Sequence, residues 1–279
     1  MMRPTRATPM TPPSPSILQR LFSLEGRAAL VTGASGGLGS AIAETLAGAG
    51  AAVGLGGTRS DGLDAVRGRV EAAGGRAAVL PGRLDDVESC RSLVRQAREA
   101  LGRLDILVNC AGINRRAALD AVTPEDFEAV LSVNLRSVFF TSQAAHPHLR
   151  EAGGGKIVNV GSMASHLGLA RIGVYGMTKA AVAQLTKTMA VEWARDGIQV
   201  NCICPGFFRT PLTREYFWGT PHRKRWLLER IPARRAGEPE ELAGAVLLLV
   251  SPASSYITGQ VISVDGGFLA GGSWDPDGE

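Results

Sequence analysis

Short apolar segments alternate with helix-length amphipathic stretches from residue 27 onward, and few folds accommodate such an order. A parallel sheet accommodates it, because each strand is buried on both faces and each connection is a helix. The sequence therefore predicts an α/β fold, a doubly wound parallel sheet of about seven strands with helices on both faces. A ligand is then expected at the carboxyl ends of the strands. The expected strands are Ala28–Val31, Ala51–Leu55, Ala77–Leu80, Asp105–Val108, Lys156–Val160, Gln199–Ile203 and Val261–Val264.

Three of the intervening stretches begin with residues that favour a helix start. Thr123-Pro124 predicts an N-cap followed by the first helical residue, and Glu238-Pro239 repeats the pattern. Asp85 and Glu88 have the spacing of a capping box. The longer helices are expected over Ser40–Ala49, Glu125–His146 and Tyr175–Ala194.

The chain of 279 residues is interpreted as one domain, because no break in composition occurs within residues 21–279. Residues 1–20 differ, since this proline-rich start has no acidic residue and predicts a disordered leader. The net charge is only +4, and the one dense basic cluster is Arg223–Arg225, which argues against a nucleic-acid partner. No apolar run approaches the roughly 20 residues of a membrane span, so no membrane partner is expected.

The cysteines Cys90, Cys110, Cys202 and Cys204 show neither the spacing of a disulfide framework nor that of a zinc site. Cys202 and Cys204 alternate within an apolar run, which indicates core thiols on one face of a strand rather than metal ligands. The sequence thus predicts no bound metal and a reducing, cytoplasmic compartment.

The first predicted strand runs into a glycine-rich turn, Thr32–Gly39, which a helix follows. Glycines at such a turn let the backbone approach a pyrophosphate at the helix N-terminus. The spacing G-x-x-x-G-x-G differs from the usual dinucleotide fingerprint, so the turn by itself is an ambiguous signal. Its position after the first strand favours a Rossmann-like dinucleotide site over an ordinary tight turn.

Tyr175 and Lys179 lie four residues apart at the start of a predicted helix, which places them on one face. A cation beside a phenol stabilises the phenolate, so this pair can move a proton to or from an alcohol oxygen. Ser162 follows the fifth predicted strand, where its hydroxyl can hold a carbonyl oxygen. Asn134 interrupts an apolar helix, which is unfavourable unless the residue has a role. The alternative for Tyr175 and Lys179 is a surface pair without a function.

With these residues together, the chain resembles the short-chain dehydrogenase/reductase family over about residues 24–270. The resemblance implies an enzyme, an NAD(P)-dependent oxidoreductase that transfers a hydride between nicotinamide C4 and a secondary alcohol or ketone. A non-catalytic dinucleotide sensor or scaffold on the same fold is the alternative, and an intact set of catalytic residues argues against it. The matching motifs are Thr32–Gly39, Asn109–Gly112, Asn134, Ser162 with Tyr175-x-x-x-Lys179, Pro205-Gly206 and Val264–Gly267.

The resemblance also implies roles for single residues. Tyr175 is the expected general acid/base, and Lys179 binds the nicotinamide ribose. Ser162 orients the reacting C–O group, and Asn134 holds a water in a proton relay. The expected cofactor-binding residues are Gly33, Ser35, Gly37, Leu38, Gly39, Thr58, Arg59, Leu84, Asn109, Ala111, Gly112, Tyr175, Lys179, Pro205, Gly206, Phe208 and Thr210.

Two positions depart from the family pattern. Arg83 stands where relatives usually have an Asp that contacts the adenine, which leaves that contact to the backbone. Cys110 replaces the second Asn of the family's N-N-A-G motif, a small change because the backbone carries much of that contact.

The cofactor is expected to be NADP, with NAD as the alternative. NAD-binding turns carry an Asp or Glu at the end of the second strand for the ribose 2′-hydroxyl, whereas this chain has Thr58-Arg59-Ser60. Arg59 can pair with a 2′-phosphate through its guanidinium group. Gly36 weakens this expectation, because many NADP-preferring relatives have a second basic residue there.

The expected substrate is a small polar molecule, a sugar acid or related polyol, bound by Arg116 and Arg171. Arg115 and Arg116 follow the Asn109–Gly112 turn, and Arg171 lies four residues before Tyr175. Guanidinium groups near the reacting carbon suit a carboxylate, and the chain resembles the gluconate 5-dehydrogenase and 2-deoxy-D-gluconate dehydrogenase branch of the family. The alternatives are arginines that are solvated or paired with acids, and a substrate of the 3-oxoacyl-[acyl-carrier-protein] reductase type.

Two further expectations concern the lid and the assembly. Residues 210–236 hold four aromatic side chains, which predict either a substrate lid or ordinary packing: Tyr216, Phe217, Trp218 and Trp226. The resemblance implies a homotetramer, with the helices Glu125–His146 and Tyr175–Ala194 at one interface and the last strand at another. Apolar residues on more than one face of Ala180–Met189 fit a helix that is buried on two sides.

Overall fold

The computed structural model describes residues 15–272, in which seven strands form one sheet in the order β3-β2-β1-β4-β5-β6-β7. All six neighbouring pairs are parallel, so the predicted fold class is confirmed. The order reverses between β1 and β4, and the carboxyl ends at such a switch point form the crevice where ligands bind. The strands are β1 (Ala28–Thr32), β2 (Ala52–Gly57), β3 (Arg76–Pro81), β4 (Ile106–Asn109), β5 (Gly155–Val160), β6 (Ile198–Pro205) and β7 (Val261–Val264).

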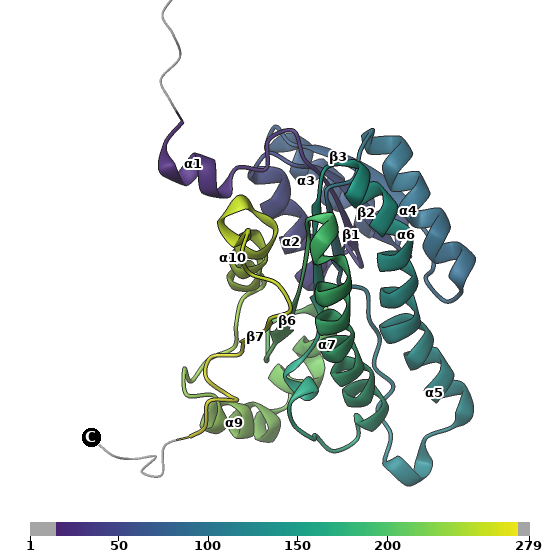
Figure 1. Ribbon diagram of the computed structural model, residues 1–279. Coiled ribbons are helices and arrows are strands. Elements are labelled where there is room, and N and C mark those ends of the chain that lie inside the picture. The colour runs from purple at the N-terminus through teal and green to yellow at the C-terminus, as the bar shows by residue number, and fades with distance from the viewer. Residues whose placement is uncertain (1–14, 273–279) are drawn as a thin grey trace, which may run out of the picture.

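Helices cover both faces of the sheet (Figure 1). One face carries α2 (Gly37–Gly48), α3 (Ser60–Ala72) and α10 (Pro239–Val250), whose apolar residues form one core cluster with the strands. The other face carries α4 (Val87–Leu101), α6 (Ser137–Glu151) and α7 (Gly173–Trp193), which form a second cluster. The shorter helices are α1 (Ile17–Phe22), α5 (Pro124–Leu131), α8 (Pro211–Thr213) and α9 (Pro221–Arg230).

All seven predicted strands are present, with bounds that differ by at most two residues. The largest differences are at β2, which continues past Leu55 to Gly57, and at β6, which continues past Ile203 through Cys204 and Pro205. These two residues pair with Ser263 and Val264 of β7, so the pairing partner extends the strand. The predicted and observed bounds of β7 agree.

Two of the three predicted helix starts are present as expected. The Thr123 hydroxyl accepts the Asp126 N–H at 3.2 Å, and Pro124 is the first residue of α5. Pro239 likewise opens α10 after Glu238. The predicted capping box at Asp85 and Glu88 is wrong, because the observed one lies one residue further along the chain.

At α4 it is Asp86 that accepts the Ser89 N–H, at 2.7 Å, and the Ser89 hydroxyl lies 3.4 Å from the Asp86 nitrogen. Asp85 is instead paired with Arg83 at 2.6 Å. Because either of two adjacent acids can cap a helix, the ion pair decides which one is free to do so.

The expected leader, residues 1–20, is too long at its carboxyl end. α1 starts at Ile17, and a capping box stabilises its start, with Ser16 Oγ accepting the Gln19 N–H at 3.2 Å. The chain joins the domain at Leu24, which is buried and donates its N–H to the Ala49 carbonyl at 2.8 Å. Residues 1–14 and 273–279 lie outside the described part of the chain.

The helix predicted over Glu125–His146 consists of three segments. α5 ends at Leu131, a π-helix spans Ser132–Arg136, and α6 continues from Ser137 to Glu151. Short π-helical turns inside α-helices occur frequently at functional sites. This one contains Asn134, the residue that the sequence singles out.

The described residues also bear on the membrane and thiol expectations. Within residues 15–272, each helix is either too short or too polar to cross a bilayer.

The four cysteines are free thiols. Cys202 and Cys204 are buried on one face of β6 with their sulfurs 3.9 Å apart, and their mutual hydrogen bond, followed by burial, raises the pKa of Cys202. These positions agree with core thiols.

Candidate active site

The glycine-rich turn between β1 and α2 depends on close backbone contacts. A Cβ on Gly33 would lie 2.9 Å from the Ala111 Cα, and Gly33 also has a φ of +71°, which favours glycine. A Cβ on Gly39 would collide with the Gly33 carbonyl oxygen. α2 therefore starts directly against the turn, and its first N–H groups can face an anion. This geometry suits the pyrophosphate of a dinucleotide.

Thr32 joins the turns after β1 and β4. Its hydroxyl accepts the N–H groups of Cys110 at 3.0 Å and Ala111 at 3.1 Å, and it lies 3.4 Å from the Val108 carbonyl. Sequence reasoning did not assign this role to Thr32, although the residue directly precedes Gly33. The hydroxyl fixes the Asn109–Gly112 turn beside the glycine-rich turn, as a site at the β1–β4 switch point requires.

Asn109 has its side chain inside the protein rather than at the cofactor. Its amide donates to Asn159 at 2.8 Å and Ser142 at 3.0 Å, and its carbonyl accepts from Thr141 at 2.7 Å. All four residues are buried. The network connects β4, β5 and α6, so the backbone of Asn109 is the part that can meet a cofactor.

Asn134 connects the π-helix to the loop that follows β4. Its side-chain oxygen accepts the Ile113 N–H at 2.8 Å, and its amide donates to the Ile113 carbonyl at 2.9 Å and lies 3.3 Å from the Thr178 hydroxyl. Asn134 is fully buried. The side chain is thus fully used in holding the loop, and the predicted relay role has to rest on the backbone of the π-helix.

Lys179 and Tyr175 lie in the first turns of α7, as their spacing predicts. The Lys179 ammonium is 5.8 Å from the centre of the Tyr175 ring, and the Lys179 side chain is buried. It donates to the Val160 carbonyl at 2.7 Å, which is the one acceptor that residues 15–272 provide. An ammonium group has three N–H donors, and a buried one needs further acceptors. The hydroxyls of a ribose and a phenolate oxygen would supply them.

Ser162 lies between β5 and α7, close to Lys179. It follows Val160, the residue whose carbonyl binds Lys179, by two positions, and its own hydroxyl accepts the Ala164 N–H at 3.1 Å. The next turn is attached to α7, because the Ser165 hydroxyl donates to the Lys179 carbonyl at 2.8 Å. A Cβ on Gly112 would lie 3.4 Å from the Asn134 oxygen and 3.5 Å from the Lys179 nitrogen. The structure therefore brings Asn134, Ser162, Tyr175 and Lys179 to the same end of the sheet.

Arg59 lies at the N-terminus of α3 and folds back over the glycine-rich turn. Its guanidinium donates to the Ser35 carbonyl at 2.8 Å and lies 3.4 Å from the Ser35 hydroxyl. Thr58 and Arg59 are exposed, and the first acid after β2 is Asp61, inside the first turn of α3. The end of β2 therefore presents a cation and no carboxylate to an adenosine ribose.

Among the remaining expected cofactor residues, Leu84 is half-buried after β3, and the neighbouring Arg83 is exposed and paired with Asp85 at 2.6 Å. Arg83 therefore offers no replacement for the missing Asp. Leu38 is half-buried at the start of α2 and packs against the core.

Beyond β6, Thr210 lies opposite Gly37: a Cβ added to Gly37 would be 3.6 Å from the Thr210 Cβ. Pro205 ends β6, and the Gly206 N–H donates to the Val264 carbonyl at 2.9 Å. Phe208 is buried and belongs to the core cluster that includes α2, α3 and α10.

The expected substrate arginines differ in their surroundings. The Arg116 guanidinium stacks on the Tyr216 ring at 4.2 Å and lies 5.7 Å from the Phe217 ring. Arg171 is exposed with a φ of +67°, and its carbonyl accepts the Ala117 N–H at 3.1 Å. This backbone bond brings the loops of Arg116 and Arg171 together. Arg115 is paired with Asp126 at 3.8 Å.

The segment 210–236 packs through its aromatic residues. Phe217 contacts Phe207 edge-to-face with ring centres 5.1 Å apart, and the exposed Trp226 lies 4.4 Å beneath the Arg230 guanidinium. Trp218 packs on a small cluster around Met163 and Leu227. Figure 1 shows α9 at the end of the molecule opposite α1, the end where the carboxyl ends of the strands lie. The aromatic residues thus pack as a layer over that end, which fits both expectations for this segment.

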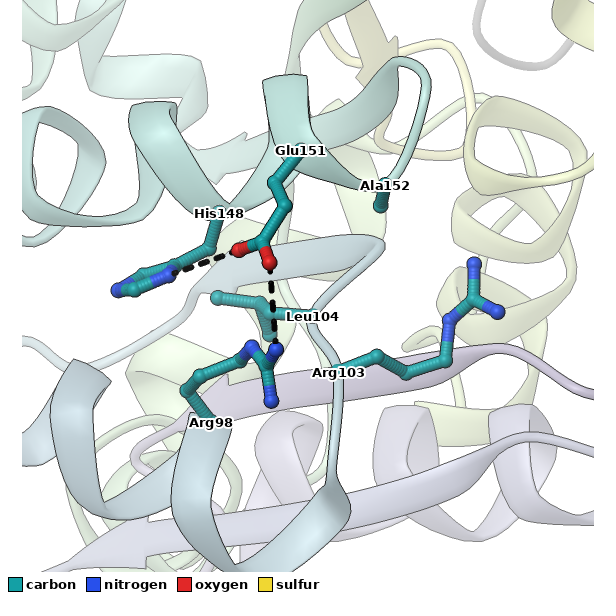
Figure 2. Close-up of a pocket in the computed structure, with 6 residues that line it drawn as sticks. All are labelled: Arg98, Arg103, Leu104, His148, Glu151 and Ala152. Atoms are coloured by element: carbon teal, nitrogen blue, oxygen red, sulfur yellow. Dashed lines mark ion pairs between the residues drawn. The ribbon is translucent and has the colours of Figure 1, made fainter.

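A separate polar pocket of about 300 Å³ lies at the opposite, amino end of β4. Figure 2 shows Glu151 between Arg98 and His148, with Arg103 directed away from them. Arg103 is paired with Asp105 at 2.7 Å, and Arg98 lies 3.5 Å from Glu151. Each arginine of this pocket already has a carboxylate partner, and none of the expected catalytic residues lines it.

Comparisons with known proteins agree with this geometry. A family model described as enoyl-(acyl carrier protein) reductase matches residues 33–269. Gluconate 5-dehydrogenase of Gluconobacter oxydans is 43% identical over 247 residues, which cover 88% of this chain and 96% of that protein. A 3-oxoacyl-[acyl-carrier-protein] reductase of Thermotoga maritima is 40% identical over 254 residues, or 88% and 99% of the two chains.

A solved structure is similar as well. The crystal structure of a gluconate 5-dehydrogenase from Burkholderia cenocepacia, in complex with NADP and tartrate, is 39% identical to this chain with a TM-score of 0.86. The match covers 90% of this chain and 98% of that one. Family model and relatives together span the sheet, the glycine-rich turn and the Ser162–Tyr175–Lys179 region. The chain belongs to the short-chain dehydrogenase/reductase family.

Proposed function

We propose that this protein is an NADP-dependent dehydrogenase that interconverts a secondary alcohol and a ketone of a small sugar acid. The observation that carries the proposal is the buried ammonium of Lys179, which lies beside the Tyr175 ring and has one acceptor among residues 15–272. A cation next to a phenol suits proton transfer, a step that a non-catalytic sensor does not perform.

The residues of this site can perform the proton transfer as follows. Nicotinamide, when bound, supplies the group at C4 that accepts or gives the hydride. Tyr175 takes the proton from the substrate hydroxyl as the alcohol is oxidised, and returns it in the reverse reaction. Lys179 stabilises the phenolate form of Tyr175 by its positive charge. Ser162 donates a hydrogen bond to the reacting oxygen and thereby orients the C–O group.

The residues also fit a dinucleotide with a 2′-phosphate. Gly33 and Gly39 leave no room for a Cβ, so the backbone N–H groups at the start of α2 are accessible to phosphate oxygens. Arg59 holds its guanidinium over the same turn, at the Ser35 carbonyl, and no carboxylate ends β2. A guanidinium can bind a phosphate with two parallel hydrogen bonds, which favours NADP over NAD.

Arg116 and Arg171 support an acidic substrate. Both are attached to loops at the carboxyl end of the sheet, and the Ala117–Arg171 backbone bond keeps these loops adjacent. Arg116 is half-buried against Tyr216, so a substrate carboxylate would meet a partly desolvated cation. The similar protein from Burkholderia cenocepacia is in complex with tartrate, a hydroxy acid with carboxylate groups.

The test compares D-gluconate with its neutral analogue D-glucitol in the presence of NADP⁺. Arg116→Ala and Arg171→Ala should each lower kcat/KM for gluconate by about tenfold or more, because a hydrogen bond to a charged group is worth about 1.5–3 kcal/mol. Neither change should affect the lower activity on glucitol. Arg115→Ala is the matched control, since Arg115 is paired with Asp126. Equal kcat/KM values for the two substrates, in the wild type and in both variants, would refute the carboxylate site.

A ketoreductase acting on 3-oxoacyl thioesters is the second candidate function. The relative from Thermotoga maritima favours it, because its identity to this chain is close to that of the gluconate 5-dehydrogenase. NADPH-dependent reduction of acetoacetyl-coenzyme A, with kcat/KM above that for 5-keto-D-gluconate, would establish this candidate in place of the sugar acid.

We further propose that the enzyme is a cytoplasmic homotetramer. Four free thiols suit a reducing compartment. Exposed apolar side chains on α6 and α7 support an interface there, including Phe139, which is 40% exposed, and Val191, which is 80% exposed. The expected second interface involves β7, whose residues are only partly buried.

A further inference from the structure

Trp218 has a buried indole N–H with no acceptor among residues 15–272. A buried indole usually finds a hydrogen-bond partner, since an unsatisfied donor in an apolar surrounding lowers the stability of the folded state. The ring packs in an apolar cluster with Met163, Phe207 and Leu227, none of which accepts a hydrogen bond from the indole. The protein therefore carries a cost at this position that packing alone does not require, because Phe would fill similar space.

Trp218 packs close to the segment between Ser162 and Tyr175. It packs in the same cluster as Met163, the residue after Ser162, and as Leu169 from the loop that leads to Tyr175. It is the last residue of a π-helix, Arg214–Trp218. Such helices are rare and occur frequently at functional sites.

The two residues before Trp218 are anchored by aromatic contacts, and their own rings meet edge-to-face at 4.8 Å. Tyr216 is stacked between two guanidinium groups, Arg116 at 4.2 Å and Arg223 at 4.0 Å. Phe217 packs edge-to-face on Phe207 at 5.1 Å. The π-helix is thus fixed both to Arg116 and to Phe207, which restrains the neighbouring indole.

We propose that the Trp218 Nε1–H donates a hydrogen bond to an oxygen of the bound sugar acid and that Trp218 determines specificity for oxygen-rich substrates. The inference rests on the proposed function. An indole donates and does not accept, so its partner must be an acceptor oxygen. A sugar acid has such oxygens on every carbon, and a site built to bind a hydroxyl discriminates strongly against a substrate that lacks one.

The experiment compares Trp218→Phe with Trp193→Phe as the matched control, since Trp193 is the last residue of α7, at the end of that helix opposite Tyr175. Trp218→Phe should lower kcat/KM for D-gluconate by about tenfold or more, while the Kd for NADP⁺ and the thermal midpoint of the free enzyme stay equal or improve. Trp193→Phe should leave kcat/KM and the Kd unchanged. A loss for gluconate but not for D-glucitol identifies a carboxylate oxygen as the acceptor, and a loss for both identifies a hydroxyl.

Two results with this variant would overturn the inference. One is a Trp218→Phe variant with the kcat/KM of the wild type, because the indole N–H would then make no hydrogen bond in the complex either. The other is a loss of kcat/KM that an equal loss of NADP⁺ affinity explains, since the acceptor would then belong to the cofactor.

A measurement on folded wild type covers the case in which the variant does not fold. Adding D-gluconate to the NADP⁺ complex should shift the tryptophan emission, and the folded Trp193→Phe variant should show the same shift. An emission spectrum that gluconate leaves unchanged at saturating turnover counts against Trp218. A wild type that neither binds nor oxidises gluconate refutes the proposed function and this inference with it, whereas equal oxidation by wild type and Trp218→Phe refutes the inference alone.

Discussion

Gly39→Ala should destabilise the protein and weaken cofactor binding. Gly48→Ala in the same helix is the matched control. A Cβ at Gly39 would collide with the Gly33 carbonyl oxygen and lie 2.8 Å from its carbon, whereas a Cβ at Gly48 meets nothing within 4 Å. Both changes gain about 0.5–1 kcal/mol from the better helix propensity of alanine. Only Gly39→Ala forces two backbone segments apart, which costs about 1–3 kcal/mol in a packed interior.

The two variants should therefore differ by about 1–3 kcal/mol, with Gly48→Ala more stable than the wild type. At about 2–4 °C per kcal/mol for a chain of this size, their thermal midpoints should differ by roughly 2–12 °C. Titration of nicotinamide fluorescence should give a Kd for NADPH raised at least tenfold in Gly39→Ala and unchanged in Gly48→Ala, because only the former displaces the start of α2. Equal thermal midpoints and equal Kd values in the two variants would refute the argument from close contact.

Three further predictions concern proton transfer, cofactor choice and stability. Tyr175→Phe should lower kcat by about 10²–10⁴ and leave the Kd for NADPH nearly unchanged; a stopped-flow rate above a tenth of the wild type contradicts the proton-transfer role. Arg59→Ala should raise KM for NADP⁺ about tenfold and leave KM for NAD⁺ unchanged, and a wild type with the lower KM for NAD⁺ overturns the preference. Burial raises the pKa of Asp105, but hydrogen bonds from Arg103, the Ala28 N–H and Arg27 outweigh it and lower the net pKa. Asp105 then stabilises the fold above about pH 4, and this contribution is lost as the pH falls further. Asp105→Asn should therefore lower the free energy of unfolding, measured in urea, by about 2–3 kcal/mol at pH 7 and by progressively less below pH 4.

The sheet could be predicted from the sequence because strand burial leaves a strong local signal. In a doubly wound sheet both faces of a strand are covered, so β1 and most of β2 consist of buried residues and appear as continuous apolar runs. The limits of the elements depend on partners elsewhere in the chain and were predicted less well. β6 extends because β7 pairs with it, and Asp86 rather than Asp85 caps α4 because Arg83 holds Asp85.

The catalytic residues could be predicted for a different reason. Tyr175 and Lys179 act from one face of one helix, so the i,i+4 spacing is itself the geometry of the pair. Thr32 and Trp218 were not assigned in this way, because their significance comes from atoms far away in the sequence. The Thr32 hydroxyl meets backbone N–H groups 78 and 79 residues away, and the Trp218 N–H is notable only because its surroundings lack an acceptor.

Asn109 and Asn134 show how far a residue type can indicate a role. Each is a buried amide within an apolar segment, and burial of an amide is costly unless its hydrogen bonds are made, so both positions predict a specific partner. The sequence does not contain the direction of the side chain. Asn109 turns inward and connects β4, β5 and α6, whereas Asn134 turns toward the Ile113 backbone and holds the loop that leads to Arg116.

Since Asn134 satisfies both backbone groups of Ile113 from a π-helical turn, a regular α-helix over Ser132–Arg136 would rotate the amide away from that loop. The irregular turn is therefore what joins the α5–α6 helix to the site, and it explains why a polar residue is retained in the middle of an apolar helix.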